Sequence, residues 1–169
     1  MIVVSDTSPI LYLLLIDQLD LLPRLYQRII IPDVVQAEMQ NPGAPLELQN
    51  WISAPPNWLE IHSVSNSASS APTNVRTLLQ RLDPGEQAAI LLAQTLNADL
   101  LIVDDLDARQ TAQNLGINIT GMLGILGEAA KRNWITLSET LERLLQETNF
   151  RASPKLIQVL LDQFSNSQG

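Results

Sequence analysis

The chain has 169 residues, enough for one domain with a sizeable core, and 46% of them are hydrophobic. Its net charge of −8 argues against a large basic face for nucleic acid and against anionic membranes, although it permits a nucleic-acid enzyme whose acidic site is screened by metal. The absence of cysteine excludes disulfides and thiolate metal sites. The N-terminus lacks the basic region of a signal peptide, and residues 10–16 are too short an apolar run to span a bilayer, so we expect a cytoplasmic protein.

The first ten residues combine a buried strand with a carboxylate. Residues 2–4 form an apolar run that is typical of a strand buried on both faces of a parallel sheet. Asp6 follows this run, and Ser8 and Pro9 suit the start of a helix over residues 8–16. Asp6 is therefore expected at the carboxyl edge of the sheet, where open α/β sheets bind ligands. Alternatively, Asp6 only helps to cap the helix.

A second strand and helix place another carboxylate in a comparable position. The strand is expected at residues 28–31, and the following helix runs from residue 32 to about residue 40. Glu38 shares one face of this helix with Val34 and Val35. A carboxylate on the apolar side of a helix needs a reason, because its unpaired burial is costly. Glu38 is either a site residue or a glutamate at the solvent-exposed rim of that face.

The middle of the chain is less regular. We expect a short helix within residues 45–56, and alternating apolar and polar residues indicate an edge or antiparallel strand at 58–64. The segment 63–70, rich in serine, alanine and asparagine, is expected to be a loop. A helix at 75–82 follows it.

The next helix begins with Asp83-Pro84-Gly85-Glu86, which has the spacing of a capping box. Glu86 would then bond back to the backbone of Asp83 and have no further role. However, Glu86 also shares a helix face with the small or apolar residues Ala89 and Ile90, which directs it toward the sheet. Both interpretations stay open at this point.

A further buried strand, residues 99–104, ends in the adjacent carboxylates Asp104 and Asp105. Asp107 is expected to cap the helix over residues 108–115, which leaves Asp104 and Asp105 without a capping role. Two adjacent carboxylates repel each other, so their presence needs another explanation. Arg109 lies at the start of this helix, where its guanidinium could pair with them or contact a phosphate.

The remaining pattern is a short strand at 117–120, a helix at 121–132, two amphipathic helices at 136–147 and 153–164, and a tail at 165–169 that we expect to be disordered. Strands alternate with helices along the chain. This alternation predicts an α/β fold with a mostly parallel central sheet and extra C-terminal helices.

Asp6, Glu38, Glu86 and Asp104 are thus all expected near strand ends or on inward helix faces at one edge of the sheet. Clustered carboxylates repel each other unless a cation compensates them. Mg²⁺ is usually bound through carboxylates, waters and substrate phosphate, and such a site can hydrolyse a phosphodiester without histidine or cysteine.

At these positions the chain resembles the PIN-domain ribonucleases over roughly residues 1–133. The resemblance rests on four stretches in the family's order and spacing: Asp-Thr-Ser-Pro from Asp6, Pro-Asp-Val-Val-Gln-Ala-Glu ending at Glu38, Gly-Glu-Gln-Ala-Ala from Gly85, and Val-Asp-Asp-Leu-Asp-Ala-Arg ending at Arg109. Within the family the chain is most similar to the VapC-like toxin group, and there to a less characterised subgroup with these motifs.

The resemblance implies a three-layer α/β/α sandwich and a Mg²⁺- or Mn²⁺-dependent endoribonuclease. Asp6 and Glu86 match the usual metal-ligand positions, and Asp104, with Asp105 as its alternative, and Glu38 match the other acids. Residues 1–133 would form the catalytic domain and 134–164 a helical extension packed on it. The residues expected to contact RNA phosphate are Arg109, Thr7 and Ser8. Family members often act as toxins, form homodimers and are inhibited by a small antitoxin protein.

Two features depart from the family pattern. Glu86 stands where many members carry aspartate, and Val103 replaces a threonine that often follows the strand. A catalytically inactive PIN-like interaction module is therefore the alternative. An aspartyl phosphohydrolase of the haloacid-dehalogenase type is disfavoured, because Ser8 stands where that chemistry requires a second aspartate after Asp6.

Overall fold

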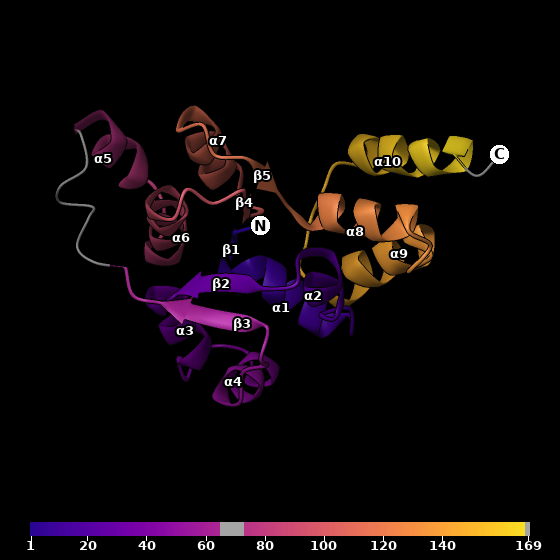
Figure 1. Ribbon diagram of the computed structural model, residues 1–169. Coiled ribbons are helices and arrows are strands. Elements are labelled where there is room, and N and C mark those ends of the chain that lie inside the picture. The colour runs from indigo at the N-terminus through magenta and orange to yellow at the C-terminus, as the bar shows by residue number, and fades with distance from the viewer. Residues whose placement is uncertain (65–72, 168–169) are drawn as a thin grey trace.

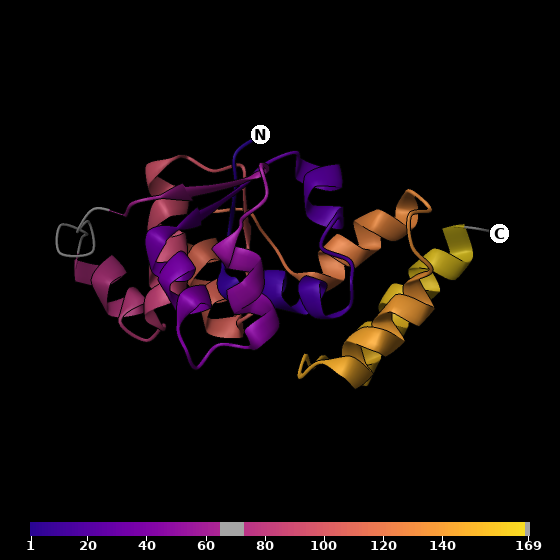
Figure 2. The same cartoon turned by 90° about the horizontal axis from the view of Figure 1, so that it is seen from below.

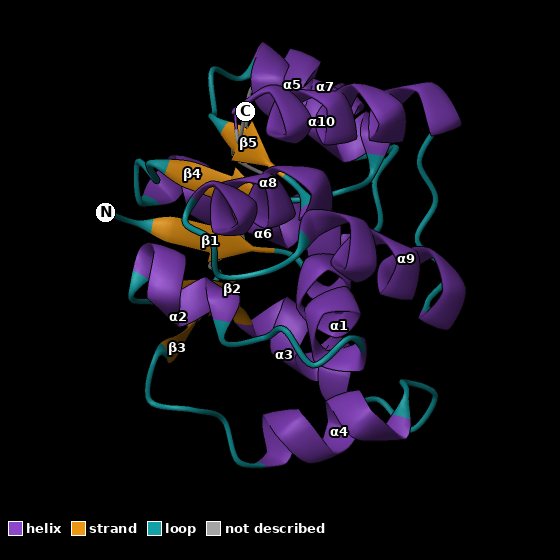
Figure 3. Ribbon diagram, turned by 90° about the vertical axis from the view of Figure 1, so that its right-hand side faces the viewer, coloured by secondary structure: helices purple, strands orange, loops and turns teal. Residues whose placement is uncertain are grey.

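The computed structural model describes residues 1–64 and 73–167 (Figure 1). In this part of the chain, five parallel strands form one sheet in the order β3-β2-β1-β4-β5, which can be followed in Figure 3. The strands are β1 (Val3–Ser5), β2 (Ile29–Pro32), β3 (Leu59–His62), β4 (Leu100–Ile102) and β5 (Ile119–Thr120). Val4 lies at the centre, paired with Ile30 on one side and Leu101 on the other.

Helices cover both faces of the sheet, because the side chains of each strand alternate between two apolar cores. Val3 belongs to one core and Val4 to the other. The first core includes side chains from α1 (Thr7–Leu15), α2 (Leu21–Tyr26), α3 (Asp33–Gln40), α4 (Leu46–Ser53), α8 (Met122–Lys131) and α9 (Leu137–Glu147). The second includes side chains from α5 (Thr73–Leu79), α6 (Pro84–Thr95) and α7 (Leu106–Asn114). The predicted three-layer α/β/α sandwich is confirmed.

The strand order creates a switch point between β1 and β4. The chain builds the sheet from β1 through β2 to β3, and then returns to the other side of β1 with β4 and β5. The backbone amide of Asp6 donates to the carbonyl of Ile102 over 3.0 Å, so the carboxyl ends of β1 and β4 are joined there. In open α/β sheets a crevice forms outside the carboxyl ends of the strands at such a point.

Several predicted element boundaries were wrong. Helix α1 begins at Thr7 with Asp6 at its N-cap position, so Ser8 lies within the helix and does not cap it. Helix α7 begins at Leu106, because Asp105 and not Asp107 is its N-cap. The strand predicted as edge or antiparallel is β3, which lies at the edge of the sheet as predicted and runs parallel to β2.

The last helix continues further than expected, whereas α9 ends at residue 147 as predicted. Helix α10 (Pro154–Ser167) includes the backbone of residues 165–167, where disorder was predicted; no proline or glycine interrupts the chain at these positions. Residues 168–169 and most of the predicted loop at 63–70 lie outside the described residues. Figures 1 and 2 show α9 and α10 at the end of the molecule opposite α5.

The C-terminal segment is attached to α1 by polar and aromatic contacts. The Arg143 guanidinium donates to the carbonyl of Ile16 over 2.9 Å and pairs with Asp17 at 3.2 Å. The ring of Phe150 meets that of Tyr12 edge-to-face, with 5.5 Å between centroids. The domain boundary at residue 133 stays a prediction. Among the described helices, none is long and apolar enough to cross a bilayer.

Candidate active site

Asp6 is a buried carboxylate at the carboxyl end of β1. Its exposed fraction is 5%, and its side chain makes no capping bond to α1, although it occupies the N-cap position. Burial raises the pKa of Asp6 to about 7, against a partial offset from the Thr7 backbone amide. The charges of Asp83, Glu38 and Asp104 raise it further. The capping explanation for Asp6 therefore does not hold, and Asp6 lies in a field of other carboxylates.

Glu38 reaches this cluster from α3. The hydroxyl of Thr7 donates to Glu38 Oε2 over 2.8 Å. Gly85, at the start of α6, faces the same carboxylate so closely that a Cβ there would lie 2.5 Å from both Glu38 oxygens. Thr7, predicted to contact phosphate, is thus bonded to Glu38 and orients its carboxylate, whereas Ser8 is half-buried in the first turn of α1.

Glu86 both caps α6 and belongs to the acidic cluster. The predicted capping box is complete: the Glu86 amide donates to Asp83 Oδ1 over 2.8 Å, and the Asp83 amide donates to Glu86 Oε2 over 3.1 Å. Burial raises the pKa of Glu86 to about 7, the Asp83 amide partly offsets this, and the charges of Asp83, Asp105 and Asp6 add to it. The two interpretations of Glu86 are therefore compatible.

Asp104 and Asp105 have different surroundings. Asp105 caps α7, accepting from the Ala108 amide over 3.0 Å. Asp104 accepts through Oδ1 from the Met122 amide at the start of α8, over 2.9 Å, and within the described residues its buried Oδ2 has no hydrogen-bond partner. Burial raises the pKa of Asp104, while the Met122 amide and Arg109 lower it. Buried polar atoms in folded proteins nearly always have a partner, and a bound ion or water would supply one for this carboxylate oxygen.

Arg109 stands beside Asp104. Its Nη1 donates to the carbonyl of Val103 over 3.1 Å. A Cβ on Gly121 would lie 2.5 Å from Asp104 Oδ1 and 2.6 Å from Arg109 Nη1, so the absence of a side chain at Gly121 makes room for both groups. Asp104 and Arg109 also line a cavity of about 710 Å³.

The donor set suits a hard divalent cation in its chemistry but not as a complete cage. Carboxylate oxygens are the ligands that Mg²⁺ prefers, and Asp104 Oδ2 is buried without a partner. In the parts of the chain that the structure describes, no three histidine, aspartate or glutamate side chains lie close enough together to hold a metal ion. Such an arrangement fits a cation bound through one or two carboxylates, with waters and substrate as its other ligands.

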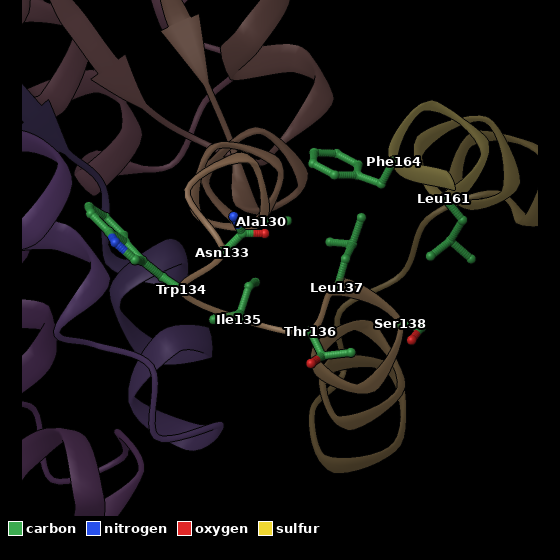
Figure 4. Close-up of a pocket in the computed structure, with 9 residues that line it drawn as sticks. All are labelled: Ala130, Asn133, Trp134, Ile135, Thr136, Leu137, Ser138, Leu161 and Phe164. Atoms are coloured by element: carbon green, nitrogen blue, oxygen red, sulfur yellow. The ribbon is translucent and has the colours of Figure 1, made fainter. Parts of the chain in front are cut away.

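A second cavity, of about 500 Å³, lies between the end of α8, the start of α9 and α10 (Figure 4). Its lining includes Trp134, Leu137 and Phe164, and it contains none of the predicted site residues. No aspartate, glutamate or histidine is among its described lining residues. The predicted site residues at the carboxyl edge of the sheet are thus separate from this cavity.

A family model described as a PIN domain matches residues 2–166. The chain belongs to the PIN-domain family. No curated protein matches the chain. PIN domains are generally nucleases and typically use divalent metal ions, so a nuclease-type function follows from membership. The match includes the residues of the C-terminal helices as far as residue 166.

Three residues of the site were missed by sequence reasoning about function. Asp83 is predicted only as a helix cap, yet after burial and the Thr7 amide its charge has the largest effect on the pKa of Asp6, ahead of the charges of Glu38 and Asp104. Burial is the main cause that raises the pKa of Tyr12. The charge of Asp104 raises this pKa further, and the charge of Arg151 lowers it. Arg151 shares the 710 Å³ cavity with Asp104. Neither Tyr12 nor Arg151 follows a strand, and no local motif marks them.

Proposed function

We propose that this PIN domain is a metal-dependent endoribonuclease that acts in the cytoplasm as the toxin of a toxin–antitoxin pair. The observation that carries the proposal is the concentration of carboxylates at the switch point, where Asp6 is buried and Asp104 retains an unpartnered oxygen. An acidic pocket without compensating ion pairs is costly to fold, and its maintenance favours a role in cation binding. The antitoxin and homodimer parts of the proposal are supported by the family resemblance alone.

The residues proposed for the Mg²⁺ or Mn²⁺ site are Asp6, Glu86 and Asp104, with one or two of these carboxylates bound to the ion directly and the rest acting through water, since no three acidic side chains of the described residues lie close enough to hold it together. A divalent ion bound there would supply Lewis acidity and a lowered pKa for a bound water. Glu38, held by Thr7, is the proposed acceptor for a proton from the attacking water. Asp105 keeps α7 in place and adds negative charge near Glu86, so we propose Asp104 and not Asp105 as the fourth acid of the site.

The direct test is cleavage of a mixed set of single-stranded and structured RNAs by the purified protein in Mg²⁺, Mn²⁺ or EDTA. We expect cleavage in at least one metal and none in EDTA. Calorimetric titration with Mn²⁺ is run in parallel, so that binding and chemistry are measured separately. Absence of both cleavage and Mn²⁺ binding would contradict the proposal and favour an interaction module that lacks catalysis.

Substitution of Gly85 by alanine should separate activity from stability. The new Cβ would collide with the Glu38 carboxylate, which lies at the end of a flexible side chain and can move away. We expect folding stability to change by less than about 1 kcal/mol, because alanine is also the better helix former. Cleavage should fall about tenfold, because the Thr7 bond that orients Glu38 is lost.

The matched control is Gly127→Ala in α8. A Cβ at this position meets Leu160 Cδ1 at 3.7 Å, an ordinary contact, so neither activity nor fold should suffer. Cleavage rates are compared at saturating metal, and stability is followed by urea unfolding. Wild-type cleavage by Gly85→Ala would remove Glu38 from the mechanism.

A further inference from the structure

The 710 Å³ cavity beside Asp104 joins two distant parts of the chain. One wall comes from α7 and the segment around Gly121, and the other from residues 150–153 between α9 and α10 together with Leu156 in the first turn of α10. Asp104 lies at its border, so a ligand in the cavity would be adjacent to the proposed catalytic carboxylates. Its volume falls within the range of roughly 300–1,000 Å³ that is typical of small-molecule sites.

Two arginines supply positive charge to this cavity. Arg109 and Arg151 both line it, and among the described residues neither forms an ion pair with a carboxylate. The Arg151 guanidinium donates to the carbonyl of Phe150 over 2.8 Å, which fixes its position. Arg109 does act on Asp104 through its charge, but neither arginine lies within ion-pair distance of a carboxylate in the described part of the chain, so in a protein with a net charge of −8 the two together are suited to bind phosphate.

Apolar side chains line the same cavity. Leu106, at the first position of α7, is 80% exposed, and Leu156 of α10 is 51% exposed. Phe150 also lines the cavity, although only 7% of it is exposed. Exposed leucines next to an aromatic ring and arginines match the way in which proteins hold an unstacked nucleobase with its phosphate.

We propose that this cavity binds one nucleotide of single-stranded RNA, with its base on the apolar wall of Leu106, Phe150 and Leu156 and its phosphate on Arg151 and Arg109. This inference rests on the proposed function and adds to it the substrate form and the residues that position it. A base-paired nucleotide would have to leave its helix to enter a cavity of this shape, so the protein discriminates in favour of single strands.

The test is fluorescence anisotropy of a short dye-labelled single-stranded RNA in EDTA and low salt, where binding is measured without cleavage. Arg151→Gln should raise the dissociation constant about five- to tenfold and lower the slope of log affinity against log salt by about one. Leu106→Ala should raise the dissociation constant about threefold; because Leu106 is exposed, its loss leaves the fold intact. The same RNA annealed to its complement should bind more weakly than the single strand.

The control is Arg28→Gln, which makes the same change in net charge. Arg28 directly precedes the amino end of β2, away from the carboxyl edge of the sheet, and pairs with Glu60 at 2.7 Å. It should bind within about twofold of wild type. Failure of the wild type to bind the RNA, equal loss in Arg28→Gln and Arg151→Gln, or equal affinity for the duplex would each overturn the inference. If Arg151→Gln cleaves RNA as well as wild type, the cavity inference is overturned and the nuclease proposal stands. If binding depends on Arg151 but no metal supports cleavage, the cavity inference stands and the nuclease proposal is overturned.

Discussion

Asp6→Asn should abolish RNA cleavage, by about 100-fold or more, and at the same time make the metal-free protein more stable at pH 8. The stabilisation follows from the raised pKa of Asp6, about 7 against an ordinary 3.8, in a side chain that is only 5% exposed. Between about pH 4 and pH 7 the folded state keeps a proton that the unfolded state has lost. Stability therefore falls as pH rises through this window, and at pH 8 the full cost of an ionised buried carboxylate is present.

Asparagine removes this cost, and the expected gain is on the order of 3 kcal/mol at pH 8 in EDTA, decreasing toward zero near pH 4. Urea unfolding at the two pH values measures it. Added Mn²⁺ should stabilise the wild type more than the variant, since the ion compensates the same charge. Asp20→Asn is the control and should alter neither cleavage nor stability, because Asp20 is exposed and makes no capping bond at the N-cap position of α2. If Asp6→Asn were less stable than wild type at pH 8, the ionised Asp6 carboxylate would not destabilise the folded state, and the prediction would be wrong.

Phe150→Ala should lower the free energy of unfolding by about 3 kcal/mol, because Phe150 is 7% exposed and joins the C-terminal segment to α1 through the ring of Tyr12. The substitution removes an aromatic side chain from the main core and leaves a cavity between these elements. It also loosens the backbone carbonyl that positions Arg151. RNA affinity should therefore fall together with stability.

Tyr12→Phe is the matched change for this contact, since it keeps the ring and removes only the hydroxyl. Its stability should stay within about 0.5 kcal/mol of wild type. Urea unfolding of both variants at pH 7 gives the comparison. A small loss for Phe150→Ala would mean that residues 148–152 can detach from α1 without unfolding the sheet.

Local patterns were sufficient to predict the position of Asp6 at a strand end, the position of Glu38 on an inward helix face, and the parallel sheet that brings them together. A short apolar run followed by a carboxylate and a helix start fixes the position of Asp6 at a strand end. The same patterns could not decide which aspartate caps α7, because three aspartates occur within four residues and the capping role depends on how the chain leaves β4. Asp105 has the geometry for it, and Asp104 is thereby left for α8.

The side of the site formed by Tyr12, Phe150 and Arg151 could not be predicted from sequence. These residues come from α1 and from the connection between α9 and α10, more than a hundred positions apart. Amphipathic spacing predicted α9 and α10 as helices but carried no information on which surface they cover. Only the folded chain shows that their connection borders the carboxylate edge.

The double role of Glu86 affects how relatives of this protein should be compared. Selection for a well-formed start of α6 would retain an acid at this position in a relative that had lost catalysis, because the capping box alone stabilises the helix. An intact Gly-Glu pair is therefore weak evidence for an active relative. Asp6, which makes no capping bond and costs stability when ionised, has no such second reason to persist, and its replacement is the change that should mark an inactive lineage.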